Sequence, residues 1–309
     1  MWNRVGHSEN YHVYLHHVNI NIILLVSTTF SKLINVKGDL MDLSVPQVMG
    51  ILNVTPDSFY AGSRKRTEGE IISRVEQILC EGASIIDIGA YSSRPNAEHV
   101  SEEEEIARLR PALDILMNRY PDAIVSVDTF RAHVAEICVE EYGVAIINDI
   151  AAGEMDTRMF DTIARLKVPY VMMHMRGTPQ NMQQSPQYED IIKEVFLYME
   201  EKLQRLHSLG VKDVILDPGF GFGKTLAHNY ELLASLQEFA IFRKPLLVGV
   251  SRKSMITRLL GVSSEEALNG TTVIHTIALT KGADILRVHD VKQAVEAVKI
   301  YNQLTRYTP

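Results

Sequence analysis

Short runs of branched apolar residues, each followed by a polar side chain, recur from Gln47 to Asp290. Each run is too short for a helix, and the longer segments between runs show helical periodicity, so the pattern predicts buried parallel strands that alternate with helices. The runs and the polar residues that follow them are 48–52 with Asn53, 84–86 with Asp87, 124–127 with Asp128, 144–147 with Asn148, 170–173 with His174, 214–216 with Asp217, 246–250 with Ser251, and 285–288, which contains Arg287, with His289. Eight such units predict an α/β fold, a closed (β/α)8 TIM barrel, in which residues at the carboxyl ends of the strands converge on one mouth. The polar side chains therefore form a candidate active site.

The segments between the runs carry helix-start signals of their own. A Ser or Thr followed three residues later by Glu forms a capping box, and an Asp before an apolar-periodic segment serves as a single N-cap. The apolar residues in 71–79 and 191–206 fall at helical spacing, which predicts core-facing helix faces. We expect Pro111 to kink or end its helix. The capping boxes are Thr67 with Glu70, Ser101 with Glu104, and Ser263 with Glu266, and the single caps are Asp156 and Asp290.

The amino-terminal part differs from the rest of the chain. Residues 1–32 show no helical or strand period that persists, and their longest apolar run is far short of a membrane span. We expect an extension that is disordered or loosely attached to a barrel domain of residues 33–309. Within that domain, the segments 33–36 and 40–43 predict a β-hairpin that closes one end of the barrel.

Composition narrows the partners and the compartment. The 309 residues suffice for one barrel, which commonly needs about 250. A formal net charge of −7 offers no general attraction for nucleic acid or an anionic membrane. An anionic ligand therefore needs a local cluster of cations. Cys80 and Cys138 lie in predicted helices without metal or redox spacing, which favours two reduced thiols in a cytoplasmic protein.

Asn53 is a candidate metal ligand. It opens the segment Asn-Val-Thr-Pro-Asp-Ser-Phe, and a carboxamide oxygen at a strand end suits a magnesium ion that is held mainly by substrate phosphates and water. The competing interpretation is an Asn that only caps a turn.

Arg287 and His289 lie two residues apart on the last strand and so face the same side. A guanidinium beside an imidazole at this place in a barrel predicts a phosphate site. For Arg287, the competing interpretation is a salt bridge within the barrel.

Three side chains with hydrogen-bond acceptors and one lysine amine complete the predicted mouth of the barrel. Asp128, Asn148 and Asp217 follow three strands, and Lys253 comes just after the seventh. Buried carboxylates need donors, and a flat heterocycle with adjacent NH and NH₂ groups supplies them, while Lys253 meets its acceptor edge. Together the four resemble a recognition frame for an aminopyrimidinone, although each carboxylate alone could be a helix cap or an Arg partner.

The glycine-rich segment 219–225 is not a phosphate loop. The pattern GxxxxGK[ST] requires glycine where this chain has Pro218, and a GxGxxG fingerprint also fails. We expect its glycines to let the backbone approach a ligand, with Phe220 or Phe222 lining an apolar cleft.

With these motifs the chain resembles the dihydropteroate synthase family, the folate-pathway enzymes that sulfonamides target. The resemblance covers residues 33–309 and rests on segments 53–59, 87–95, 127–129, 147–149, 173–180, 216–224, 251–254 and 287–290. It implies a transferase that joins 6-hydroxymethyl-7,8-dihydropterin diphosphate to 4-aminobenzoate, giving 7,8-dihydropteroate and pyrophosphate.

The resemblance also implies roles for individual residues. Diphosphate leaves readily once a metal and cations neutralise it, so no covalent protein nucleophile is required. We expect Arg287→Ala and Asn53→Ala to lose turnover far more than fold. The implied roles are Asp128, Asn148, Asp217 and Lys253 for the pterin; Asn53 for Mg²⁺; Asn53, Arg94, Arg287 and His289 for the diphosphate; Ser93, Pro95, Phe222 and Ser254 for the aminobenzoate; and Asp57, Phe59 and Asp87 for loop closure. Of these, Asn53, Lys253, Arg287 and His289 form the implied catalytic set.

Two departures separate this chain from the common family pattern. Ala61 lies in a stretch where many members carry a second aspartate, and Tyr91 stands where glutamate is common. Two other functions remain open on the sequence: a methyltetrahydrofolate-to-corrinoid methyltransferase, which has no need of the diphosphate cations, and a catalytically silent pterin-binding paralogue. His174 has no assigned role, and the family suggests a homodimer formed through helices near the carboxyl terminus.

Overall fold

The computed structural model describes residues 32–55, 68–91, 100–179, 182 and 186–307. Within them, eight parallel strands pair in the order β8-β7-β6-β5-β4-β3-β10-β9. A parallel bridge between Leu216 and Leu246 joins the two edges, so the barrel is nearly closed and the predicted (β/α)8 fold is confirmed. The strands are β3 Gln47–Asn53, β4 Ile85–Gly89, β5 Ile124–Asp128, β6 Ile146–Asp149, β7 Tyr170–Met173, β8 Val214–Asp217, β9 Leu247–Val248 and β10 Ile285–Val288.

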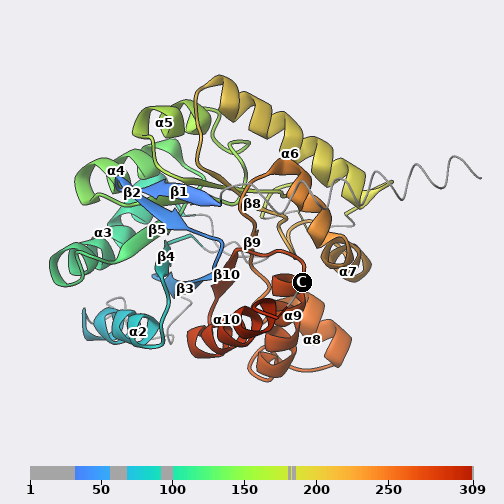
Figure 1. The fold of residues 1–309 in the computed structure, drawn as a ribbon. Helices are drawn as coiled ribbons and strands as arrows, with labels where there is room; N and C mark the ends of the chain where they lie inside the picture. The colour runs from blue at the N-terminus through green and yellow to red at the C-terminus, as the bar shows by residue number, and fades with distance from the viewer. Residues whose placement is uncertain (1–31, 56–67, 92–99, 180–181, 183–185, 308–309) are drawn as a thin grey trace, which may run out of the picture.

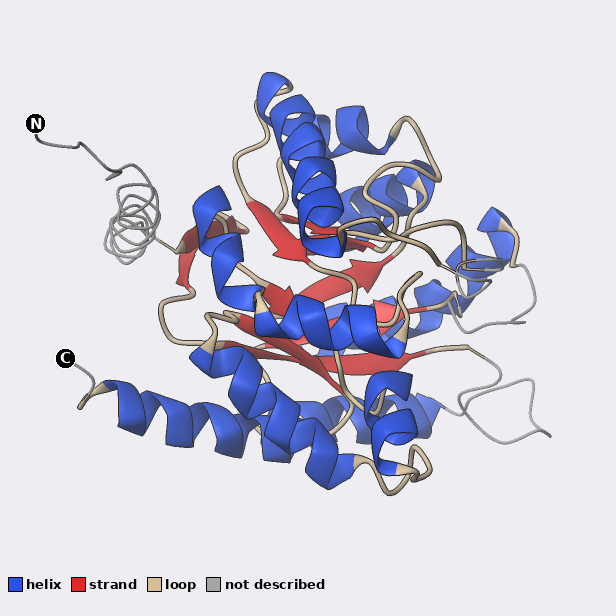
Figure 2. Cartoon of the chain, turned by 90° about the vertical axis from the view of Figure 1, so that its right-hand side faces the viewer, coloured by secondary structure: helices blue, strands red, loops and turns tan. Residues whose placement is uncertain are grey.

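Helices surround these strands (Figures 1 and 2). They are α2 Glu68–Cys80, α3 Glu102–Arg119, α4 Ala132–Tyr142, α5 Met159–Leu166, α6 Ile191–Ser208, α7 Leu226–Ala234, the 3₁₀ helix η2 Leu236–Phe242, α8 Ser254–Leu260, α9 Leu268–Thr280 and α10 Val291–Thr305. The predicted stripes are confirmed, since α2 and α6 bury their periodic apolar residues against the barrel. None of the helices in the described ranges is long and apolar enough to cross a membrane.

Strand side chains alternate between two apolar layers. In β4, Ile86 and Ile88 pack outward against the helices, whereas Ile85 points into the barrel. In β10, Leu286 and Val288 pack outward and Ile285 inward. Because side chains along a strand have a period of two, the next inward positions fall one layer closer to the carboxyl ends of the strands.

The predicted hairpin is confirmed and closes the other end of the barrel. It consists of β1 Leu33–Val36 and β2 Asp39–Asp42. The two-residue turn at Lys37 and Gly38 has positive φ at both positions, 54° and 96°, as tight hairpin turns require. Ile34, Val36 and Leu43 are buried with the inward residues Met49, Ile85, Ala145, Ile146, Val171, Ile215, Leu247 and Ile285.

Three expectations about elements need to be compared with the structure. Pro111 does not end its helix, because α3 continues through it to Arg119, and a kink there stays a prediction. Asp87 does not end its strand, since β4 continues to Gly89. Asp290 stands at the N-cap position of α10, but its carboxylate binds the Arg252 guanidinium at 2.8 Å through both oxygens instead of capping the helix.

The other predicted helix caps can be compared with the hydrogen bonds in the structure. The Ser101 cap is confirmed, because its hydroxyl accepts a hydrogen bond from the Glu104 amide. Ser263 and Glu266 exchange both capping-box hydrogen bonds, but a turn follows and α9 begins only at Leu268. The Asp156 carboxylate accepts from Ala132, the first residue of α4. Thr67 lies outside the described residues.

Candidate active site

The inward positions nearest the carboxyl ends of the strands carry the predicted site residues. Asn53 on β3 pairs in register with Gly89, Gly89 pairs with Asp128, and Asp128 pairs with Asn148. A methyl group built on Gly89 would lie 3.5 Å from Asn53 Oδ1 and 3.8 Å from Asp128 Oδ2. The missing side chain at Gly89 therefore leaves space between a carboxamide and a carboxylate at the mouth.

Arg287 lies at the centre of this layer. Its Nε donates to Asp87 Oδ2 at 2.6 Å and its Nη2 donates to Asp128 Oδ2 at 2.7 Å. Asp87 is fully buried and also accepts from Asn148 Nδ2 at 3.2 Å. The salt bridge within the barrel, the alternative considered from sequence, is therefore present. It does not use the whole guanidinium, because Nη1 has no hydrogen-bond partner in the described part of the chain and the side chain keeps 20% exposure.

Burial changes the protonation of this cluster. It raises the pKa of Asp128 to about 7 even though the Arg287 guanidinium acts in the opposite direction. Burial also acts to lower the pKa of Arg287, but Asp87 and Asp128 outweigh it and raise that pKa. Arg287 therefore stays charged, and Asp128 has a raised pKa even beside it.

Asp217 and Lys253 form the facing part of the site. The Gly219 amide donates to Asp217 Oδ1 at 2.8 Å. A methyl group built on Gly249 would lie 3.9 Å from Lys253 Nζ and 4.0 Å from Asp217 Oδ2, so both groups border the same small space. Burial lowers the pKa of Lys253 to about 8, with Asp217 opposing the shift, and it raises the pKa of Asp217, with Lys253 opposing.

Lys253 also contacts the loop after β8. Its Nζ donates to the Phe220 carbonyl oxygen at 2.5 Å and lies 4.5 Å from the centre of the Phe222 ring. An ammonium over an aromatic face is attracted to it. Phe222 is half-buried, as expected for a cleft residue, but Phe220 is fully buried in the core and lines no cleft.

Two glycines of this loop are required by a close approach between backbone segments. A methyl group built on Gly219 would lie 1.9 Å from the His174 carbonyl oxygen, and one on Gly223 would lie 2.4 Å from that of Arg176. Gly219 and Gly223 therefore let the loop approach the backbone that follows β7. The expected approach of this loop to a ligand stays a prediction.

The other predicted site residues are half-buried or exposed, or they lie outside the described residues. His289 is half-buried, and its amide donates to the Ser251 hydroxyl at 3.2 Å. Ser254 is exposed at the first position of α8. Asn53 is half-buried, and its side chain makes no hydrogen bond to any described residue. Asp57, Phe59, Ala61, Ser93, Arg94 and Pro95 lie outside the described residues.

Sequence reasoning missed the two glycines that shape the mouth and the contacts of Tyr91. Gly249 lies two residues after the inward Leu247, so strand parity could have found it. Tyr91 packs edge-on against Phe130 at 5.1 Å and lies 5.5 Å from the Arg131 guanidinium. Nothing in the sequence signalled that contact.

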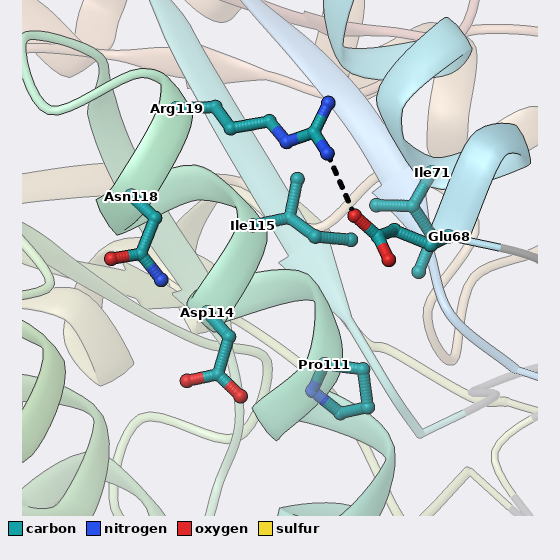
Figure 3. Close-up of a pocket in the computed structure, with 7 residues that line it drawn as sticks. All are labelled: Glu68, Ile71, Pro111, Asp114, Ile115, Asn118 and Arg119. Atoms are coloured by element: carbon teal, nitrogen blue, oxygen red, sulfur yellow. Dashed lines mark hydrogen bonds and ion pairs between the residues drawn. The ribbon is translucent and has the colours of Figure 1, made fainter.

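A separate hollow of about 360 Å³ lies at the surface between α2 and α3 (Figure 3). Across it, the Arg119 guanidinium binds the Glu68 carboxylate at 2.8 Å. It contains none of the predicted site residues, so it is not the barrel mouth. Among the described residues, no three His, Cys, Asp or Glu side chains gather in a way that could hold a metal ion.

Known proteins share this architecture and much of the sequence. Residues 49–289 match the family described as pterin binding enzyme. The dihydropteroate synthase of Escherichia coli (strain K12) is 44% identical over 266 residues, which cover 85% of this chain and 93% of that protein.

Solved structures agree. A Yersinia pestis dihydropteroate synthase in a sulfonamide drug complex has a TM-score of 0.83 at 42% identity, covering 89% of this chain and all of that one. A Xanthomonas albilineans dihydropteroate synthase with 4-aminobenzoic acid also has a TM-score of 0.83, at 36% identity, covering 90% of this chain and all of that one. The chain therefore belongs to the dihydropteroate synthase family of pterin-binding enzymes.

Proposed function

We propose that the protein is a dihydropteroate synthase, which transfers a pterinylmethyl group from 6-hydroxymethyl-7,8-dihydropterin diphosphate to the amine of 4-aminobenzoate. The observation that carries the proposal is the pair of Asp217 and Lys253, a buried carboxylate and a half-buried amine that border one space above Gly249. A pterin presents adjacent NH and NH₂ donors to the carboxylate and a carbonyl to the amine. Each buried group then has the partner that burial demands.

The opposite side of the mouth suits the pterin's other edge and the leaving group. Asp128 offers an acceptor whose raised pKa lets it carry a proton near neutral pH, and Asn148 lies beside it in register. Arg287 keeps one guanidinium nitrogen free of partners in the described residues, and His289 follows two residues later on the same face. The Arg287 guanidinium can neutralise charge that develops on departing diphosphate, and the His289 imidazole can donate a hydrogen bond to it.

The residues present also fit a magnesium ion. The Asn53 carboxamide faces the mouth over Gly89 without a hydrogen bond to the described residues, so its oxygen is available as one hard ligand. When bound, magnesium would neutralise the diphosphate and make it a better leaving group.

Positioning supplies the remaining part of the reaction. Phe222 lies under Lys253 at the edge of the pterin space, and Ser254 follows at the start of α8. We assign these two, with Ser93 and Pro95, to the 4-aminobenzoate cleft. The displacement is dissociative: the bond to diphosphate breaks first, and the dihydropterin ring delocalises the positive charge left on its methylene. The amine of 4-aminobenzoate then adds to that carbon and loses a proton, and no protein nucleophile takes part.

The direct test is to incubate the protein with both substrates and magnesium and to identify the products by mass. We expect dihydropteroate and pyrophosphate in equal amounts. Pterin binding without product would instead identify a catalytically silent paralogue. Undiminished product in the presence of a chelator would contradict the role of Asn53.

We further propose that the enzyme acts as a homodimer in the cytoplasm. Val273 and Ile277 on α9 and Ile300 on α10 are exposed apolar residues on two helices that pack together (Figure 1). Burying such residues against a second copy would remove them from water. Sedimentation equilibrium should give twice the chain mass, and Ile300→Lys should shift it toward the monomer.

A further inference from the structure

Lys224 is a buried lysine that the proposed reaction leaves without a role. It is 3% exposed, and lysine is rarely buried without partners. Its Nζ lies 2.8 Å from the Gly219 carbonyl oxygen, 3.0 Å from that of Phe222 and 3.3 Å from that of His174. His174 Nδ1 lies 2.9 Å away. Every neighbour is an acceptor, so the site is built for an ammonium group, although burial lowers the pKa of Lys224.

His174 must be neutral to take part in this arrangement. An ammonium only donates, so His174 Nδ1 must accept, and its single proton then lies on Nε2. Burial, reinforced by the charge of Lys224, lowers the pKa of His174 well below its ordinary value. The ring is also held by Tyr198, which packs edge-on at 4.8 Å. The histidine that ends the fifth predicted strand is therefore one wall of a cation site.

The Lys224 ammonium holds together a strongly bent loop. Gly219, Gly221 and Gly223 adopt φ values of 70°, 83° and 61°, and the Gly219 and Phe222 carbonyls turn toward one point. Without a cation between them, the Phe222 carbonyl oxygen would lose the Lys224 donor, and the Gly219 carbonyl oxygen would keep only the Phe222 amide. Glycine makes the bends possible, and Lys224 makes them stable.

The same loop determines where Lys253 lies. The Phe220 carbonyl, between the two carbonyls that bind Lys224, accepts from Lys253 Nζ at 2.5 Å. The Phe222 ring lies 4.5 Å from that nitrogen, and a methyl group built on Gly221 would lie 3.3 Å from Lys253 Cδ. Any rearrangement of the loop would therefore move the amine and the ring that border the proposed substrates.

We propose that Lys224 and His174 are positioning residues, which fix the 219–223 loop so that Phe220 and Phe222 hold Lys253 in its substrate-binding orientation. The proposal rests on the proposed function, because that function gives Lys253 and Phe222 their ligands. Neither Lys224 nor His174 touches a substrate in this scheme.

Kinetics of matched variants test the proposal. Lys224→Met removes the charge and keeps the length, His174→Leu removes the acceptor, and His174→Asn keeps an acceptor close to the position of Nδ1. At a temperature where all are folded, we expect the first two to raise KM for both substrates about tenfold or more, with a smaller change in kcat. His174→Asn should stay within about threefold of the wild-type KM.

A matched control separates this effect from the general loss of a lysine-to-carbonyl contact. Lys244 donates to the Lys212 carbonyl oxygen at 2.9 Å beside the amino ends of β8 and β9, and Lys244→Met should leave both KM values unchanged. Folded Lys224→Met with wild-type KM values would overturn the proposal and leave Lys224 a stabilising residue only.

Amide hydrogen exchange gives a readout that needs no activity. The Gly221 amide donates to Asn229 Oδ1 at 2.7 Å and the Phe222 amide to the Gly219 carbonyl oxygen at 3.1 Å. Both should exchange faster in Lys224→Met and in His174→Leu than in wild type, with exchange in the barrel strands unchanged. Equal exchange would overturn the positioning role even if the protein makes dihydropteroate. Faster exchange in a protein that makes none would reject the proposed function alone.

Discussion

Gly249 shows at the scale of one residue how far the site depends on a missing side chain. A methyl group there would make ordinary contacts of 3.9–4.0 Å with Arg287, Lys253 and Asp217, so the unliganded fold accepts it, but a larger group fills the space assigned to the pterin. We expect Gly249→Val to lower kcat/KM about a hundredfold or more, with little change in melting temperature. Steady-state kinetics and thermal unfolding check this.

Gly143 provides the opposite control. It ends α4 with φ of 61° and has open space around its Cα. Gly143→Ala should therefore cost about 1 kcal/mol of stability through backbone strain and leave kcat/KM unchanged. A large activity loss there, or none in Gly249→Val, would contradict the assignment of the mouth.

Arg287 and Asn53 now call for different expectations. Arg287→Ala leaves the buried Asp87 and the half-buried Asp128 without their cation, so we expect it to lose about 3–5 kcal/mol of stability as well as turnover. Asn53→Ala breaks no hydrogen bond to a described residue and should lose turnover alone. Equal melting temperatures for the two variants, measured by calorimetry, would contradict this difference.

At the scale of elements, the hairpin and the mouth are independent parts of one barrel. Ile34 is 1% exposed inside the closed end, whereas Leu40 on the same hairpin is 67% exposed. We expect Ile34→Ala to cost about 2–5 kcal/mol and Leu40→Ala to cost almost nothing, with kcat unchanged at a temperature where both are folded. A lower kcat in folded Ile34→Ala would show that the closed end is coupled to the site.

A buried histidine on helix α9 makes the free energy of unfolding depend on pH. Burial lowers the pKa of His275 from 6.5 to about 4, with Asp290 opposing, and its Nε2 has no hydrogen-bond partner among the described residues. Since the unfolded chain binds this proton first, wild type should lose stability as the pH falls from 6.5 to 4, by roughly 3 kcal/mol. His275→Leu should remove that loss. The free energy of unfolding of both proteins can be measured with denaturant at each pH. If it changed by the same amount in wild type and in His275→Leu across this range, the role of His275 would be ruled out.

The periodicity of the elements explains which parts of the fold could be predicted. Strand runs and helix stripes are local, so the barrel, the hairpin and the core-facing sides of the helices followed from them. Asp87 was misplaced as a strand end because its run was read as stopping at the first charged residue, while an inward charge inside a barrel is tolerated when Arg287 binds it. Pro111 does not end its helix because tertiary packing of α3 overrides a single missing amide hydrogen bond.

At the scale of the whole molecule, the mouth required contacts between residues far apart in sequence. Position at the strand ends indicated that Asp128, Asp217 and Arg287 lie at one mouth, but not that Arg287 binds two carboxylates. Likewise, the role of Lys224 beside His174 depends on three carbonyl oxygens that the side-chain pattern does not reveal. Pairing within the layer follows from barrel geometry, which no single segment encodes.

The central claim is that the inward residues at the carboxyl ends of the strands form a dihydropteroate synthase site with Asp217 as its pterin acceptor. Asp217→Asn keeps the size of the side chain but replaces one acceptor oxygen with a donor. One measurement decides: dihydropteroate formation by wild type and by Asp217→Asn at saturating magnesium. We predict product from wild type and a loss of about a hundredfold or more in kcat/KM for the variant, with its fold retained. Equal rates for the two proteins, or no product from wild type, would contradict the claim.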